Sequence, residues 1–398
     1  MPPRTIIYTG KGGVGKSSVA LATARCCARE GLRTLVVSTD PAHTLADALE
    51  REVGSRPTPC GRRLYAQQVQ AQEEIERRWD AVQSWLTKLL SERGVDRIAA
   101  EELTVPPGMD ELFALLAIKE HYERGDFECL IVDCAPTGET LRLLSFPDVA
   151  AWWLEKVIPL ERKLVAAARP LARTLLDVPL PDDPVFDEVE RLVRGLGGLA
   201  TILRERRTTS VRLVLNPERI VVREAMRTYT YLSLYGFPVD AIVVNRVLPP
   251  EADDGYLAPW RELQNRQMEL VREAFAPLPI LVAPMFAEEV VGTRMLDRLA
   301  AALFGEAHAH EILYDGARHE FKEDPDGARL TLPLPLATRD EIKLSKVGLE
   351  LVVRVGAHKR TVLLPDSLAG CAPTGARFED GVLEVSFRRP RSSLVATP

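Results

Sequence analysis

Short apolar runs alternate with longer helical stretches over the first 300 residues. The runs are rich in Val, Ile and Leu, as is typical of strands that are buried on both faces. We predict strands at residues 5–9, 33–37, 129–132, 211–215, 241–244 and 279–282. Because strands that alternate with helices favour a mostly parallel sheet with helices on both faces, this part is predicted to be α/β.

Two stretches are too long to be simple connections of an α/β unit. Residues of about 61–125 and 148–208 are rich in Leu, Ala, Arg and Glu, and we predict helical insertions that pack together. Residues 148–176 carry many apolar side chains, including Trp152 and Trp153. They could line a groove for apolar ligands or form the core of ordinary packed helices, and the pattern leaves both interpretations open.

The pattern changes again after residue 305. Residues 306–311 are predicted to be a linker, and residues 312–390 alternate apolar and polar positions between turn signals. We predict strands at 328–332, 349–355, 361–364 and 382–387, and a frayed tail at 391–398. A run of strands after an α/β unit implies a second domain. We therefore expect an α/β domain over residues 1–305 and an all-β sandwich over residues 312–390.

The composition narrows the class of protein. The chain has 398 residues, of which 46% are hydrophobic and 27% charged, and its net charge of −6 argues against electrostatic binding of nucleic acid. No apolar run approaches the roughly 18–20 residues of a membrane span, and the N-terminus lacks the apolar segment of a signal peptide. Six cysteines in so long a chain do not suggest a disulfide framework. We expect a soluble, cytoplasmic protein that binds no nucleic acid and does not span a membrane.

A phosphate-binding pattern follows the first predicted strand. Residues 10–17, GKGGVGKS, satisfy G-x-x-x-x-G-K-[ST] between a strand and a helix. Such a loop surrounds phosphate oxygens with backbone N–H groups at a helix N-terminus. Lys16 is expected to reach the β- and γ-phosphates of ATP, Ser17 to ligate Mg²⁺ and Ser18 to contact the α-phosphate. The predicted nucleotide contacts in this loop are Gly12, Gly13, Val14, Gly15, Lys16, Ser17 and Ser18.

Two aspartates follow later strands, at the edge where open α/β sheets bind ligands. Asp40, in STDPAHT, could orient or deprotonate the water that attacks the γ-phosphate, or could simply cap the next helix. Asp133 ends a predicted strand, where a carboxylate would hold Mg²⁺. Pro136 and Thr137 follow it, in a loop that is expected to contact nucleotide and to change shape when the γ-phosphate leaves.

Three segments carry a family resemblance. GKGGVGKSS, STDPAHTLAD and DCAPTGETLRLLSFP, in this order, closely resemble the arsenical pump-driving ATPase family, which includes the ATPases that guide tail-anchored membrane proteins. The resemblance covers roughly residues 4–305 and implies a homodimer. It implies that Lys11, the extra lysine of a deviant Walker A loop, reaches the partner's nucleotide and supplies transition-state charge. The alternative for Lys11 is a solvated surface lysine.

The same resemblance implies contacts to the nucleoside. Glu218 matches a nucleotide-contacting glutamate, and Asn245 matches the asparagine that reads adenine. The adenine loop would be formed by Pro284, Met285 and Phe286. Two positions depart from the family pattern, because Glu139 replaces the usual His and Cys134 the usual Thr. Neither departure removes a phosphate or Mg²⁺ ligand.

The cysteines separate the subfamilies. Arsenite needs two or three neighbouring thiolates, but residues 135–370 contain no cysteine. The targeting ATPases of eukaryotes bind zinc through a C-x-x-C pair, and the matching stretch here, residues 249–272, also has none. We therefore predict neither an arsenite site of the known kind nor zinc, and we expect ATP and Mg²⁺ as the cofactors.

Residues 376–387, ARFEDGVLEVSF, resemble the last strands of an α-crystallin-type small heat-shock domain. Such a domain could bind clients at a sheet edge or could simply cover the ATPase surface, and both remain open. The whole chain resembles the branch of targeting-type ATPases that carries this domain.

We therefore expect a Mg²⁺-dependent ATPase that handles hydrophobic, tail-anchored-like protein clients as a nucleotide-gated homodimer, with a membrane receptor or a pump protein as a further partner. Lys11, Lys16 and Asp40 are the expected catalytic residues. One alternative is an ATPase subunit that drives arsenite or anion efflux. Others are a holdase with a slow nucleotide switch and a partition ATPase, although the large inserts and the sandwich are unusual for the latter.

Overall fold

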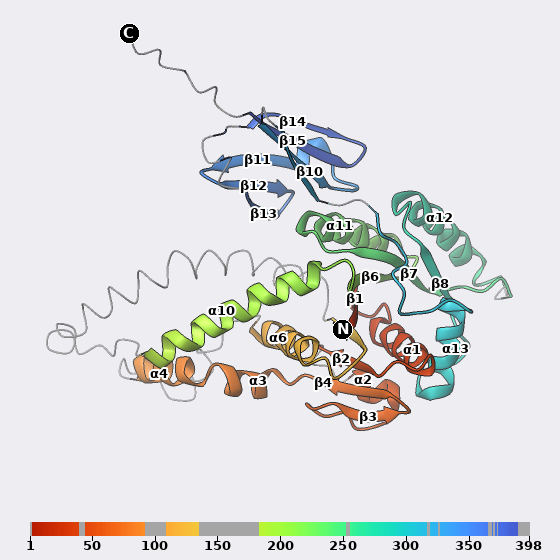
Figure 1. The fold of residues 1–398 in the computed structure, drawn as a ribbon. Helices are drawn as coiled ribbons and strands as arrows, with labels where there is room; N and C mark the ends of the chain where they lie inside the picture. The colour runs from red at the N-terminus through yellow and green to blue at the C-terminus, as the bar shows by residue number, and fades with distance from the viewer. Residues whose placement is uncertain are drawn as a thin grey trace, which may run out of the picture.

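The computed structural model describes residues 2–39, 44–91, 109–134, 183–251, 255–316, 319–324, 327–364, 368, 371 and 373–388. Figure 1 shows a central sheet with helices around it and a smaller all-β unit beyond helix α11. Within these residues, no helix combines the length and the apolar character that crossing a membrane requires. The α/β class and the appended all-β unit predicted from the sequence are both confirmed.

The central sheet has eight strands in the order β3-β4-β2-β5-β1-β6-β7-β8. All neighbouring strands are parallel except β3 and β4. The six strands predicted from apolar runs are present, and β2 and β5 are buried along their whole length. The bounds are β1 Arg4–Thr9, β2 Thr34–Ser38, β3 Thr58–Gly61, β4 Leu64–Gln68, β5 Cys129–Asp133, β6 Thr209–Leu215, β7 Val239–Val247 and β8 Ile280–Pro284.

Helix α1 runs beneath the centre of this sheet. It begins directly after the phosphate-loop pattern, contacts β5 and α13, and is rich in alanine, which lets it approach the strands closely. Its outer end is at Arg29, about 20 Å from its first residue at 1.5 Å per residue. The other helices of this unit are α2 Thr44–Leu49, α11 Arg219–Tyr235, α12 Ala258–Ala274 and α13 Gly292–Phe304, and α1 itself spans Lys16–Arg29.

The helical insertions form a layer that reaches away from the sheet (Figure 1). The layer contains α3 Ala71–Arg78, α4 Asp80–Ser91, α6 Met109–Arg124 and the long α10 Asp183–Arg204. Helix α10 packs against α4 and α6. The approach to α6 is tight at Gly195, where a Cβ would lie 3.0 Å from the Leu116 side chain.

The prediction of a helical insertion from about residue 61 is wrong at its start. Residues Leu64–Gln68 form β4, a strand of the central sheet. Its Gln67 and Gln68 are buried, so two polar side chains hide the apolar pattern of a buried strand. A cavity of about 520 Å³ between α6 and α10 is lined mainly by charged side chains. The apolar stretch 148–176, the candidate client groove, lies outside the described residues.

The C-terminal unit is a sandwich of two antiparallel sheets, ordered β14-β15-β10-β9 and β11-β12-β13. Its core is built from Leu330, Leu332, Val353, Val385 and other side chains that alternate along the strands. The strands missed from the sequence are β9 and β11, and β14 was indicated only by the resemblance of residues 376–387 to the last strands of a small heat-shock domain. The bounds are β9 Glu320–Asp324, β10 Gly327–Pro333, β11 Ile342–Val347, β12 Glu350–Val355, β13 His358–Leu363, β14 Pro373–Glu379 and β15 Val382–Arg388.

The sandwich rests on helix α11, which also covers the central sheet. Leu234 of α11 is fully buried in the sandwich core, and the Tyr231 ring lies 3.6 Å from the His358 ring. His319 donates from Nε2 to the Ser233 carbonyl at 2.7 Å and accepts at Nδ1 from Arg360 at 2.7 Å. These contacts support the interpretation of the sandwich as a domain that covers the ATPase surface.

The connecting segment, residues 305–316, is fixed by buried charges. Arg212 is fully buried and donates to Asp240 at 3.1 Å. The same guanidinium donates to the backbone carbonyls of Ala309 and Glu311, each at 2.9 Å. Arg4 donates to the His310 carbonyl at 2.6 Å. The predicted linker is thus hydrogen-bonded to two strands of the central sheet, β1 and β6.

Candidate functional site

The phosphate-loop pattern forms a tight loop between β1 and α1. Gly13 and Gly15 have φ angles of +79° and +92°, in the left-handed region that favours glycine. Gly15 has a second constraint, because a Cβ there would lie 2.3 Å from Nδ2 of Asn245. A side chain at Gly10 would lie 2.1 Å from the Val214 carbonyl oxygen. Glycine is therefore strongly favoured at these positions.

Side chains from neighbouring strands hold the carbonyl groups of the loop. Asn245 donates to the Val14 carbonyl at 2.9 Å and Arg246 to the Gly13 carbonyl at 3.0 Å. In a trans peptide the N–H points away from the C=O. The N–H groups that follow these carbonyls therefore point to the opposite side of the loop. There they join the unpartnered first N–H groups of α1 as donors for an anion.

The polar groups at the carboxyl ends of the strands lie beside the loop. Asp133, at the end of β5, is 1% exposed and accepts from the Ser38 hydroxyl at 3.4 Å. The Ser17 and Thr44 hydroxyl oxygens are 3.0 Å apart. Hydroxyl and carboxylate oxygens are the donors that Mg²⁺ prefers, so Ser17 and Asp133 fit a Mg²⁺ site. Asp40, Pro136 and Thr137 lie outside the described residues.

Lys16 and Lys11 occupy different environments. Lys16 is 6% exposed, with its amine turned into the loop. Lys11 stands on the outer side, 41% exposed, with its Nζ 3.7 Å from a carboxylate oxygen of Glu224 on α11. Cys134, beside Asp133, is buried, and burial followed by the charge of Asp133 raises the pKa of its thiol to about 12. Cys134 therefore remains a protonated, apolar neighbour of the site.

The residues predicted to contact the nucleoside differ in exposure and location. Glu218 is exposed at the start of α11, and Met285, just after β8, is 51% exposed. The Phe286 ring lies 5.3 Å from the Arg298 guanidinium. Asn245 is 7% exposed and supports the loop from behind through the contact to Val14. Pro284 is the last residue of β8.

Two residues of the site were not found from the sequence. Arg246 holds Gly13, and Asn216, with its amide oriented to suit its surroundings, donates to the Val14 carbonyl at 3.2 Å and to the Asn245 carbonyl at 3.3 Å. Asn216 follows β6 and Arg246 lies near the end of β7. Their position at strand ends is the one available signal, and it does not distinguish them from turn residues.

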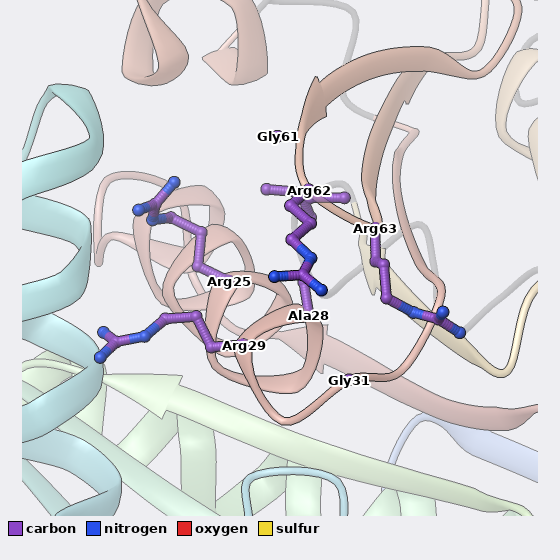
Figure 2. A pocket seen from close by; sticks show the side chains of 8 residues that line it. Arg25, Ala28, Arg29, Gly31, Gly61, Arg62 and Arg63 are labelled. Carbon is purple, nitrogen blue, oxygen red and sulfur yellow. The ribbon is translucent and has the colours of Figure 1, made fainter.

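A different, arginine-lined cavity lies at the far end of α1. Figure 2 shows it, with a volume of about 480 Å³, between Arg25, Arg29, Arg62 and Arg63. Arg25 and Arg29 both pair with Asp297, and Arg63 pairs with Glu128 at 2.7 Å. Because three of the four arginines already have a carboxylate partner, this cavity is a weaker anion site than the backbone-lined loop.

The six cysteines all lie within the described residues and are free thiols. Five of them are buried, and Cys26 is partly exposed. The Cys27 and Cys129 thiols contact each other within the core under the central sheet. The thiols are therefore not arranged as an exposed cluster.

Comparison with known proteins agrees with this geometry. Residues 3–305 match the family model described as anion-transporting ATPase, and residues 325–387 match the HSP20-like domain found in ArsA. A putative arsenical pump-driving ATPase from Chlorobaculum tepidum is 36% identical over 390 residues, which cover 96% of each chain.

Two further relatives are similar to this chain. Putative arsenical pump-driving ATPase 1 from Aquifex aeolicus is 35% identical over 386 residues, covering 94% of this chain and 98% of its own. ATPase GET3B from Arabidopsis thaliana is 29% identical over 310 residues, covering 72% of this chain and 75% of its own. The first two relatives therefore match both parts of the chain.

Proposed function

The chain belongs to the anion-transporting ATPase family and is an ATP hydrolase with an HSP20-like domain, and from this premise we propose that it works as a Mg²⁺-dependent, nucleotide-gated homodimer that binds, holds or targets hydrophobic protein segments. A membrane receptor or a pump protein is then the expected partner. The client role is supported by the family resemblance to targeting ATPases and by the large helical insertions.

The position of Lys11 carries the dimer proposal. Its side chain leaves the loop on the outer side, toward Glu224, whereas Lys16 is turned into the loop. A lysine in this position is available to a nucleotide bound by a second copy, where it would supply positive charge as an arginine finger does. A second copy would also cover the exposed apolar side chains of Trp260 and Leu263 on α12.

The chain's own residues have separate roles in the proposed reaction. Backbone N–H groups of residues 12–15 and Lys16 bind the phosphates, and Ser18 contacts the α-phosphate. Ser17 and Asp133 would hold Mg²⁺, which would supply positive charge to the phosphates. Asp40 orients the attacking water, and Pro136 and Thr137 respond to loss of the γ-phosphate. Nucleoside contacts come from Glu218, Asn245, Pro284, Met285 and Phe286.

A complementation assay tests action across the dimer. Lys11→Ala and Lys16→Ala proteins are each expected to hydrolyse ATP poorly. In a random mixture, half of the dimers are mixed, and each mixed dimer has one complete site if Lys11 acts on its partner's nucleotide. The mixture should therefore recover about one quarter of the wild-type rate. If the mixture stays as inactive as the two single proteins, Lys11 does not act across a dimer.

The client role needs a separate measurement. Asp40→Asn protein, held with ATP and Mg²⁺, is expressed beside a tail-anchored helix and purified. We expect the helix to co-purify with a dimer, and to be released when active protein hydrolyses ATP. A nucleotide-bound dimer that retains no helix would contradict the client role while leaving the ATPase dimer intact.

The names of the arsenical pump-driving relatives favour one other function, an ATPase that drives arsenite or anion efflux. It predicts that arsenite or antimonite stimulates ATP hydrolysis. The burial of five of the six thiols argues against a known type of arsenite site. Stimulation of at least severalfold, abolished by Cys26→Ser, would favour this function over client handling.

A further inference from the structure

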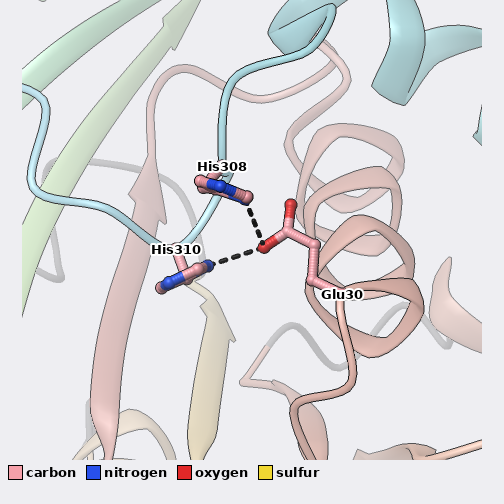
Figure 3. Close-up of side chains that lie close together, drawn as sticks. All are labelled: Glu30, His308 and His310. Atoms are coloured by element: carbon pink, nitrogen blue, oxygen red, sulfur yellow. Dashed lines mark hydrogen bonds and ion pairs between the residues drawn. The ribbon is translucent and has the colours of Figure 1, made fainter.

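Three titratable side chains meet where the connecting segment passes the outer end of α1. They are Glu30, the residue after α1, and His308 and His310 of the connecting segment (Figure 3). Nδ1 of His310 lies 2.6 Å and Nδ1 of His308 lies 3.6 Å from the same carboxylate oxygen, Oε2 of Glu30. One ligand atom from each of the three residues lies within 4.8 Å of the others.

The fold holds these side chains in place from both sides. The backbone around the two histidines is fixed, because Arg212 donates to the carbonyls of Ala309 and Glu311 and Arg4 donates to that of His310. Ala309 between them is fully buried. Its N–H donates to the other oxygen of Glu30 at 3.4 Å.

The carboxylate is oriented further by Cys26, one helical turn earlier, whose thiol donates to Oε1 of Glu30 at 3.3 Å. Oε1 therefore receives hydrogen bonds from the protein, while Oε2 faces the two imidazoles. A set of ligands that is already oriented by hydrogen bonds from neighbouring groups needs little rearrangement to bind a metal ion.

Two imidazole nitrogens and one carboxylate oxygen form a common ligand set for zinc and for neighbouring divalent transition-metal ions. We propose that Glu30, His308 and His310 bind one such ion, with water at the remaining position, and that the ion fastens the connecting segment to α1. At metal–ligand distances of about 2.1 Å, tetrahedral ligands are about 3.4 Å apart. The His310 ring therefore moves back from its present hydrogen bond, by side-chain rotation.

Access to the site is open. The side chain of His308 is 60% exposed, and that of His310 is 33% exposed. The site is unrelated to the C-x-x-C zinc pair whose absence from residues 249–272 led us to expect no zinc. It also does not depend on the proposed client role, because every ligand lies at the end of α1 that is far from the phosphate loop.

Metal binding can be measured directly on untagged, full-length, metal-free protein. Calorimetric titration with Zn²⁺ and the visible spectrum with Co²⁺ should give one ion per chain with a Kd on the order of 1 µM or tighter. His308→Ala, His310→Ala and Glu30→Gln should each weaken binding at least about 10-fold. Hydrogen exchange of the Ala309 amide should slow when Zn²⁺ is added to wild-type protein.

Glu306→Gln is the matched control, because it removes an exposed carboxylate from the same segment but outside the cluster. Its Zn²⁺ affinity should equal that of the wild type. The proposal is overturned if wild-type protein binds Zn²⁺ only in the millimolar range. It is also overturned if the double variant His308→Ala/His310→Ala keeps wild-type affinity. Because His308 is 60% exposed, the single variant His308→Ala is expected to fold normally, and its loss of Zn²⁺ binding then reports on the site.

Discussion

The two ends of helix α1 show two ways of building a site. At the first end, the proposed phosphate site is built mainly from main-chain N–H groups, in a loop that glycines, Asn245 and Arg246 hold in shape. At the outer end, the site consists of the side chains of Glu30, His308 and His310, which a fixed backbone brings together. The first site is encoded in eight consecutive residues. The second needs residues that are hundreds of positions apart, so it exists only once the whole sheet has formed.

This difference predicts that the site at the outer end of α1 depends on distant buried charges. Removing one of these charges should have the largest effect on stability. Asp240→Asn leaves the buried Arg212 without its carboxylate, which should reduce the free energy of unfolding by about 3–5 kcal/mol. Urea denaturation measures this loss. Asp297→Asn removes a more exposed carboxylate that pairs with Arg25 of α1 and should cost at most about 1 kcal/mol. Equal losses in the two variants would contradict the role assigned to the Arg212 pair.

A glycine at each end of α1 offers a direct comparison. Gly15→Ala should lower the rate of ATP hydrolysis at least about 100-fold, because the new Cβ collides with Asn245 and displaces the loop. Gly31→Ala, at φ +98° with no atom within 4 Å of the new Cβ, should cost about 1–2 kcal/mol of stability and leave the rate unchanged. Phosphate release and urea denaturation test both variants. A normal rate in Gly15→Ala protein would show that the loop tolerates the displacement.

Acid should weaken the contact between the sandwich and helix α11. Burial, then the charge of Arg360, lowers the pKa of His319 to about 3, below the usual 6.5. The unfolded chain therefore takes up the proton first. Stability from neutral His319 is complete above pH 6.5 and is lost as the pH falls toward 3, by at most about 1.4 kcal/mol per pH unit.

His319→Gln tests this dependence. Its free energy of unfolding, measured in urea at pH 7 and at pH 5, should fall less between the two pH values than that of wild-type protein. The same substitution at His121 serves as the comparison. Burial also lowers the pKa of His121, but this residue lies away from the sandwich. If the His319→Gln variant loses as much stability as the wild type, His319 is not the responsible group.

The smallest effect concerns the support behind the loop. Asn245→Ala removes the donor to the Val14 carbonyl, and we expect the KM for ATP to rise about 10-fold, the equivalent of one hydrogen bond. Asn265→Ala, on the exposed face of α12, is the control and should leave the KM unchanged. An unchanged KM in Asn245→Ala protein would mean that Asn216 and Arg246 hold the loop without it.

The same contrast explains what the sequence could predict. The phosphate loop was predictable because glycine spacing and a following helix are local features. The six apolar strands of the central sheet were predictable for the same reason. Strand β4 was missed because Gln67 and Gln68 are buried although polar. Strand β14 was not found from the alternation of apolar and polar residues, because most of its residues are exposed and lack an apolar face. Arg246, Asn216 and the Glu30 cluster acquire their roles only through tertiary contacts.

Helix α11 has a consequence for how this architecture can change over generations. Its Leu234 belongs to the core of the sandwich, while other apolar residues of the same helix, such as Val222, belong to the core of the ATPase unit. If the last 80 or so codons of the gene were lost, the remaining protein would carry an exposed apolar patch on α11. We therefore expect the presence of a sandwich and an apolar residue at position 234 to be inherited together, and lineages without the sandwich to carry a polar residue there.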